Sequence, residues 1–112
     1  MLELKEKVKV ISDEKISEIY SYCSKVSKES IEEITDALLR LVLNSKRGEL
    51  KDSLGQVIFH LQKNERINTL IGLQKLIEAS LRVAPEEMFK VLESSDEDAK
   101  QLAQNIKKVL QI

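Results

Sequence analysis

Residues that interrupt helices are scarce in this chain of 112 residues. It contains three glycines and one proline, the two residue types that cost the most free energy inside a helix. Hydrophobic residues make up 42% of the chain, and many of them recur at helical spacing. We therefore predict an all-α fold, a compact bundle of five or six helices that forms a single domain over residues 1–112.

Aromatic residues, cysteines and long apolar runs are also scarce. Tryptophan is absent and aromatics make up 4%, so the core must be aliphatic, with few rings left for stacking bases or ligands. The one cysteine, Cys23, cannot form an intrachain disulfide, which favours a reducing cytoplasm. No apolar run is long enough to cross a membrane, and the lysine-rich start lacks the pattern of a signal peptide.

The charge balance excludes a strongly basic nucleic-acid coat protein and an acidic tail. Charged residues make up 33% of the chain, yet the formal net charge is −1. High Lys, Glu and Ile with little Gly or Pro is typical of proteins from hot environments, although helical bundles in general share this composition.

The first eleven residues fit two structures. The alternation at Val8 and Val10 predicts a short strand or an extended arm, whereas Leu4, Val8 and Ile11 also fit one face of a helix. A lone strand is not stable by itself, so an extended arm would pack against the bundle or pair with a second copy.

Capping residues and breakers divide the rest into six predicted helices. Ser12 is the expected N-cap of the first helix, and Ser27 or Ser30 caps the second. Pro85 suits the first position of the fifth helix, and Ser94 or Ser95 caps the sixth. The first four helices are predicted over about 13–26, 27 or 30 to 46, 49–62 and 65–83, with a chain reversal at Lys63-Asn64.

Two glycines fall inside predicted helices. Gly55 and Gly72 are almost equidistant from the Lys63-Asn64 reversal, so an antiparallel hairpin would place them nearly opposite each other. Such a pair would let two backbones approach closely. The alternative is a coincidence between two tolerated helix glycines.

Several large apolar residues lie off the predicted core stripes. The helix over 65–83 is apolar around more than half of its circumference, so it is either the buried centre or contacts both its own core and a partner. Middle helices that pack on two sides would also explain such residues; otherwise they form an interface. The candidate interface residues are Leu39, Leu43, Phe59 and Leu73.

No catalytic constellation, metal site or phosphate loop stands out, so we expect neither enzyme activity nor a cofactor. His60 is the only histidine and has no Cys or His at ligand spacing, which predicts a surface or boundary residue. Cys23 falls in the apolar stripe of the first helix, which predicts a buried and inert thiol.

The middle of the chain is relatively basic. Residues 40–82 hold eight basic and four acidic residues, whereas 29–39 hold four acids and no base. Alternating charges on a solvated face explain most of this pattern. If the region binds nucleic acid, the candidate phosphate contacts are Arg40, Lys46, Arg47 and Lys51.

The sequence predicts a small cytoplasmic, non-enzymatic assembly or adaptor protein that acts through aliphatic helix faces. Its partner is expected to be a second copy, as a homodimer, or another protein. The alternative is a helical nucleic-acid-binding regulator that uses the basic 40–66 region.

Overall fold

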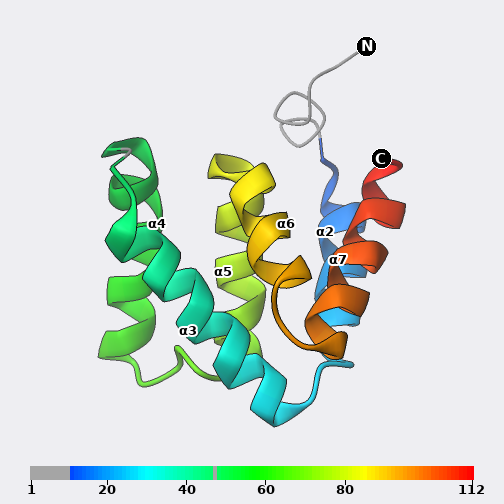
Figure 1. Ribbon diagram of the computed structural model, residues 1–112, viewed down its shortest axis with the longest axis horizontal. Helices are drawn as coiled ribbons and strands as arrows, with labels where there is room; N and C mark the ends of the chain where they lie inside the picture. The colour runs from blue at the N-terminus through cyan, green and yellow to red at the C-terminus, as the bar shows by residue number, and fades with distance from the viewer. Residues whose placement is uncertain (1–10, 47) are drawn as a thin grey trace.

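The computed structural model describes residues 11–46 and 48–112, the side chain of Glu49 excepted. This part of the chain forms six helices and no strand, which confirms the predicted all-α fold (Figure 1). The predicted arm over 1–11 lies outside the described residues except for Ile11, which packs against the core. The helices are α2 (Asp13–Cys23), α3 (Lys28–Asn44), α4 (Gly48–Lys63), α5 (Leu70–Val83), α6 (Pro85–Glu93) and α7 (Glu97–Leu110).

Helix α5 lies at the centre of the bundle. It packs against α2, α3, α4 and α6, and Figure 1 shows it between α4 and the α2–α7 pair. Leu73, Leu76 and Ile77 are fully buried within it. The wide apolar surface of this helix is therefore explained by neighbours inside the chain, the first of the two interpretations of the sequence pattern.

Polar side chains cap the helix starts, with one correction to the prediction. Ser12 caps α2 by accepting from the Lys15 amide at 3.3 Å, and Ser27 caps α3 by accepting from the Ser30 amide, also at 3.3 Å. The prediction of Ser94 or Ser95 at the last helix was wrong, because Asp96 caps α7 and accepts from the Ala99 amide at 3.0 Å. A carboxylate is favoured there by the helix dipole.

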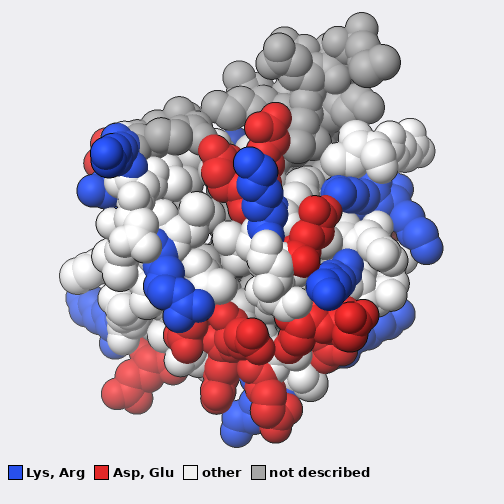
Figure 2. All heavy atoms as spheres, viewed as in Figure 1, with Lys and Arg blue, Asp and Glu red and all other residues white. Residues whose placement is uncertain are grey.

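The starts of α3 and α7 are joined by side-chain hydrogen bonds. Ser30 Oγ donates to Asp96 Oδ2 at 2.5 Å, and the Ser27 amide donates to Asp98 Oδ2 at 3.0 Å. The Ser30 hydrogen bond is the main cause that lowers the pKa of Asp96 below its ordinary value. Figure 2 shows Asp and Glu gathered along the lower edge of the molecule, where these two helices begin.

The reversal between α4 and α5 is longer than predicted. Helix α4 ends at Lys63, one residue beyond the predicted end at about residue 62, but α5 begins at Leu70 instead of near residue 65. Glu65 adopts a left-handed conformation with φ of 56°, and the Arg66 amide donates to the Leu61 carbonyl at 2.8 Å. This geometry is a Schellman motif, which stops a helix and turns the chain.

The N-cap at Thr69 fixes the start of α5 at Leu70. Thr69 Oγ1 accepts from the Gly72 amide at 3.2 Å and donates to the Arg66 carbonyl at 2.6 Å. Thr69 thereby caps α5 and ties the cap to the preceding loop. Because the reversal spans residues 64–69, its centre lies three residues later than the sequence predicted.

The predicted contact between the two glycines was wrong. A Cβ atom on Gly72 would collide with the carbonyl oxygens of Arg66 and Ile67, whereas nothing lies within 4 Å of the Cβ position of Gly55. The displaced reversal changes the register of α4 against α5 and removes the expected symmetry. Gly72 is required by its own loop, and Gly55 is required by no described residue near it.

Candidate interaction surface

The four candidate interface residues lie in three different environments. Leu43 on α3 and Phe59 on α4 are exposed by 67% and 62%, as the sequence pattern predicted. Leu39 is half-buried and packs against the core. Leu73 is fully buried at 0% exposure, so its assignment to an interface was wrong, because α5 is surrounded by four helices.

The outer face of α4 carries a shallow hollow beside Phe59. Its lining comes from one helix, and Gly55 opens it because the space above its Cα holds no other atom within 4 Å. The ring of His60 stands beside the Phe59 ring in an edge-on arrangement, with centroids 6.1 Å apart and planes at 70°. The hollow is lined by Lys51, Asp52, Gly55, Gln56, Phe59 and His60.

Four exposed side chains on α4 share one stripe. Asp52, Gln56, Phe59 and Lys63 follow the spacing i, i+4, i+7 and i+11, which places them on the same side of a helix. The opposite side carries Leu50, Leu54, Ile58 and Leu61, all buried in the core. We call the four exposed residues the outer α4 stripe. Its ends carry opposite charges, and its centre carries a large aromatic ring.

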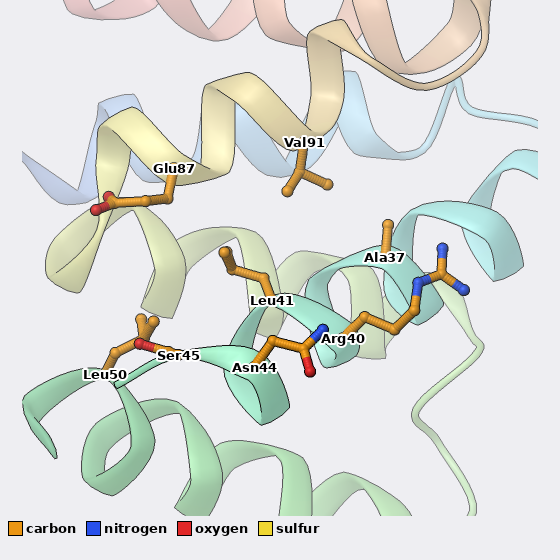
Figure 3. Close-up of a pocket in the computed structure, with 8 residues that line it drawn as sticks. All are labelled: Ala37, Arg40, Leu41, Asn44, Ser45, Leu50, Glu87 and Val91. Carbon is orange, nitrogen blue, oxygen red and sulfur yellow. The ribbon is translucent and has the colours of Figure 1, made fainter. Parts of the chain in front are cut away.

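A second hollow runs between α3 and α6 (Figure 3). Ala37 and Leu41 from α3 and Val91 from α6 point toward one another and form its apolar floor. Arg40 and Asn44 stand on the α3 rim, and the hollow continues past Arg40 toward Ser94 and Ser95. The three floor residues are only partly exposed, so this hollow offers less apolar surface than Phe59 and Leu43 do.

The candidate phosphate contacts do not share a hollow. Arg40 lines the hollow between α3 and α6, and Lys51 lines the one on α4. Lys46 is exposed in the turn before α4, and Arg47 lies outside the described residues. On the face in Figure 2, the basic side chains are scattered, and several of them stand beside acidic ones. The fold thus gathers acids at one edge and leaves these bases dispersed.

Cys23 and His60 lie in the environments that the sequence predicted, one buried and the other at the surface. Cys23 is fully buried, and burial raises the pKa of its thiol to about 12, so little thiolate forms at neutral pH. His60 is exposed on α4. No cluster of three or more metal-ligating side chains occurs in the described part of the chain.

Tyr20 connects α2 to α5 at the edge of the core. Its hydroxyl donates to Glu78 Oε1 at 3.1 Å, and Gln74 Nε2 donates to the Tyr20 carbonyl at 3.2 Å. Burial, with the Glu78 carboxylate beside it, raises the pKa of Tyr20 to about 12. These contacts make Tyr20 a packing residue that joins α2 to α5.

The outer α4 stripe was not recognised from the sequence, although the signal was present. Phe59 was singled out, but Asp52, Gln56 and Lys63 were not considered with it. Their spacing around Phe59 and the opposite charges at the two ends can both be read from the sequence. Ile71, which is 46% exposed at the start of α5, was also missed.

Comparisons with known proteins find no match for this chain. Within the described residues, no helix combines the length and apolar character that a membrane crossing requires. No protein-family model matches the chain, and searches of curated proteins and of solved structures find no significant match.

Proposed function

We propose that this chain is a small non-enzymatic assembly or adaptor protein that binds a protein surface through the apolar side chains exposed on α3 and α4. The observation that carries this proposal is the exposure of Leu43 and Phe59, at 67% and 62%, outside a core already filled by other side chains. Burying a side chain of this size against a partner contributes about 1.5–3 kcal/mol.

The surroundings of Phe59 support a protein partner. An aromatic ring at the centre and polar side chains at the rim are the usual arrangement of protein interfaces, and aromatic residues often contribute most of the binding energy. Here the polar neighbours are Asp52, Gln56 and Lys63, all exposed on the same stripe. The polar rim would keep the surface soluble before the partner binds.

The distribution of bases favours this proposal over nucleic-acid binding. Phosphate-driven binding needs several Lys or Arg residues on one surface, whereas Arg40 and Lys51 lie in separate hollows. We place the protein in the cytoplasm on the same basis as in the sequence analysis, its single cysteine, which the fold buries.

The proposal is tested by capture of non-covalently bound partners from a lysate of the native cell at low and high salt. We compare the wild-type chain with Leu43→Glu and Phe59→Glu, and use Gln104→Glu on α7 as the control because Gln104 is also exposed. Wild type and control should retain the same protein at both salt concentrations, since apolar association does not weaken with salt. The Phe59→Glu chain should lose it.

Two results would contradict the proposal. One is co-purification of nucleic acid that dissociates at high salt, as counterion release requires. The other is identical capture by all four folded chains. The fold of each variant is checked by its helical circular dichroism and its unfolding midpoint.

A further inference from the structure

Gly55 is an unfavourable residue in the interior of a helix. Glycine weakens a helix relative to alanine, and it persists where a backbone must approach closely or φ is positive. Neither reason applies within the described chain, since no atom lies within 4 Å of its Cβ position and no described glycine has a positive φ. The notch at Gly55 remains available for a group from outside.

The group that would fill the notch lies one helical turn away. Phe59 follows Gly55 by four residues on the outer side of α4, and both line the same hollow. A notch and a protruding ring on one helix face are complementary to each other. When two identical surfaces meet across a two-fold axis, residue i of each copy contacts residue j of the other.

The charges of the outer α4 stripe fit the same two-fold axis. Asp52 and Lys63 stand at its two ends, and the midpoint between them is residue 57.5. The midpoint between Gly55 and Phe59 is residue 57, so one axis serves both pairs. An antiparallel copy of α4 would place each Phe59 over a notch and each Asp52 beside a Lys63.

We infer that the partner of this surface is a second copy of the chain, packed with its α4 antiparallel to the first so that Phe59 of each copy fills the Gly55 notch of the other. This inference rests on the proposed function and specifies its partner. The symmetry brings Asp52 of each copy next to Lys63 of the other, which makes two charge pairs at the ends of the interface.

The charge pattern also selects the orientation. A parallel arrangement would place Asp52 beside Asp52 and Lys63 beside Lys63, and like charges in contact oppose association. Lys51 lies 100° around the helix from Asp52, toward the flank. The axis at residue 57 brings Lys63 of the antiparallel copy level with Lys51, while Gln62, which is exposed and uncharged, lies on the same flank. Lys51 therefore offsets part of the attraction between Asp52 and Lys63, and the antiparallel orientation still brings fewer like charges together than the parallel one.

The expected dimer is weak. Helix α4 has 16 residues and is about 24 Å long, so a single helix pair buries less surface than a stable interface of standard size. We expect a dissociation constant in the micromolar to millimolar range, which sedimentation equilibrium can measure.

Charge exchange between two variants gives a direct test. Asp52→Lys and Lys63→Glu each place like charges at both ends of the antiparallel dimer, so each variant alone should dimerise at least tenfold more weakly. Mixing the two restores both charge pairs and should restore dimerisation between them. Glu18→Lys on α2, another exposed acid, makes the same charge change away from the stripe and should dimerise like wild type.

A second variant tests the notch. Gly55→Leu fills the space that the Phe59 ring of the other copy would occupy, and it should abolish the dimer while the chain stays folded. The matched control is Ser53→Leu, which adds the same side chain to α4 at an exposed position off the stripe. This control should keep the wild-type dissociation constant.

The outcomes separate this inference from the proposed function. A wild-type chain that stays monomeric at millimolar concentration overturns the inference, as does a dimer that neither charge variant weakens or that mixing fails to restore. In those cases, Phe59-dependent capture of a different protein would still uphold the proposed function. Loss of each single-variant dimer and its restoration in the mixture would support the antiparallel pairing.

Discussion

Gly55 on α4 and Gly72 on α5 lie on neighbouring helices but in different steric environments. Helix α4 descends to the reversal and α5 returns from it (Figure 1). A Cβ atom on Gly72 of α5 would meet the carbonyl oxygen of Ile67 at 2.5 Å, whereas one on Gly55 of α4 would meet nothing within 4 Å. Packing inside the chain thus explains the glycine of α5 and leaves that of α4 to another cause.

The apolar residues near these glycines differ in the same way. Leu73, next to Gly72, is fully buried, whereas Phe59, one turn after Gly55, is 62% exposed. Four helices surround α5, and α4 keeps one side toward solvent. Apolar character by itself therefore does not identify an interface. A large apolar side chain that no neighbouring helix covers is the better indication of an interface.

The largest difference is expected when leucines of the two environments are truncated. Leu73→Ala should lower the free energy of unfolding by about 3 kcal/mol, because it leaves a cavity in the centre of the bundle. Leu43→Ala should change it by less than about 0.5 kcal/mol. Urea denaturation at low protein concentration measures both. Equal losses would mean that Leu43 belongs to the core.

The glycines themselves provide the next test. Gly72→Ala should lower the free energy of unfolding by about 2 kcal/mol, since the new methyl group can be accommodated only if the Arg66–Ile67 backbone shifts. Gly55→Ala should raise it by up to about 1 kcal/mol through better helix propensity. Thermal unfolding of dilute samples gives both signs. A loss at Gly55 would show that α4 needs this glycine for its own fold.

The turn between the two helices offers a smaller gain. Glu65 holds a left-handed conformation, φ 56°, that glycine adopts without steric cost. Glu65→Gly should therefore stabilise the chain by up to about 1 kcal/mol, measured as a rise in the unfolding midpoint. Glu65→Ala keeps the strain and serves as the control. Equal midpoints for Gly and Ala would argue against this Schellman geometry.

The smallest effect is expected inside α5. Ser80 is fully buried, and its Oγ has no hydrogen-bond partner among the described residues. Removing such a hydroxyl leaves no unsatisfied group behind, so Ser80→Ala should be neutral or stabilise by up to about 1 kcal/mol. Thr35 Oγ1 donates to Asn68 Oδ1 at 2.7 Å. Thr35→Val should instead lower the free energy of unfolding by about 1 kcal/mol. A larger loss for Ser80→Ala than for Thr35→Val would contradict this account.

The exposure of a candidate interface residue could be predicted where the apolar stripe of its own helix was enough to place its side chain. Leu43 and Phe59 lie away from the core stripes of their own helices, and both are exposed. Leu73 was misassigned because a helix wheel shows which sides are apolar but not how many neighbours cover them. The loop carbonyls that require Gly72 were likewise invisible, since residues 64–69 were not predicted to form the whole reversal.

The sequence by itself determined the helical class and most helix ends. Few breakers, the spacing of apolar residues, Ser12 before α2 and Pro85 at the start of α6 are local signals, and local hydrogen bonds and backbone sterics act on them directly. Helix α4, for example, ends at Lys63, within one residue of the predicted end.

Only the tertiary structure decided the burial of α5 and the hydrogen bonds that join the start of α7 to the start of α3. Each depends on groups that are brought together by folding. The four helices around Leu73 and the Ser30 hydroxyl that donates to Asp96 lie outside the helix they affect. Contacts between residues far apart in the sequence leave no regular spacing along the chain, so a local sequence pattern cannot predict them.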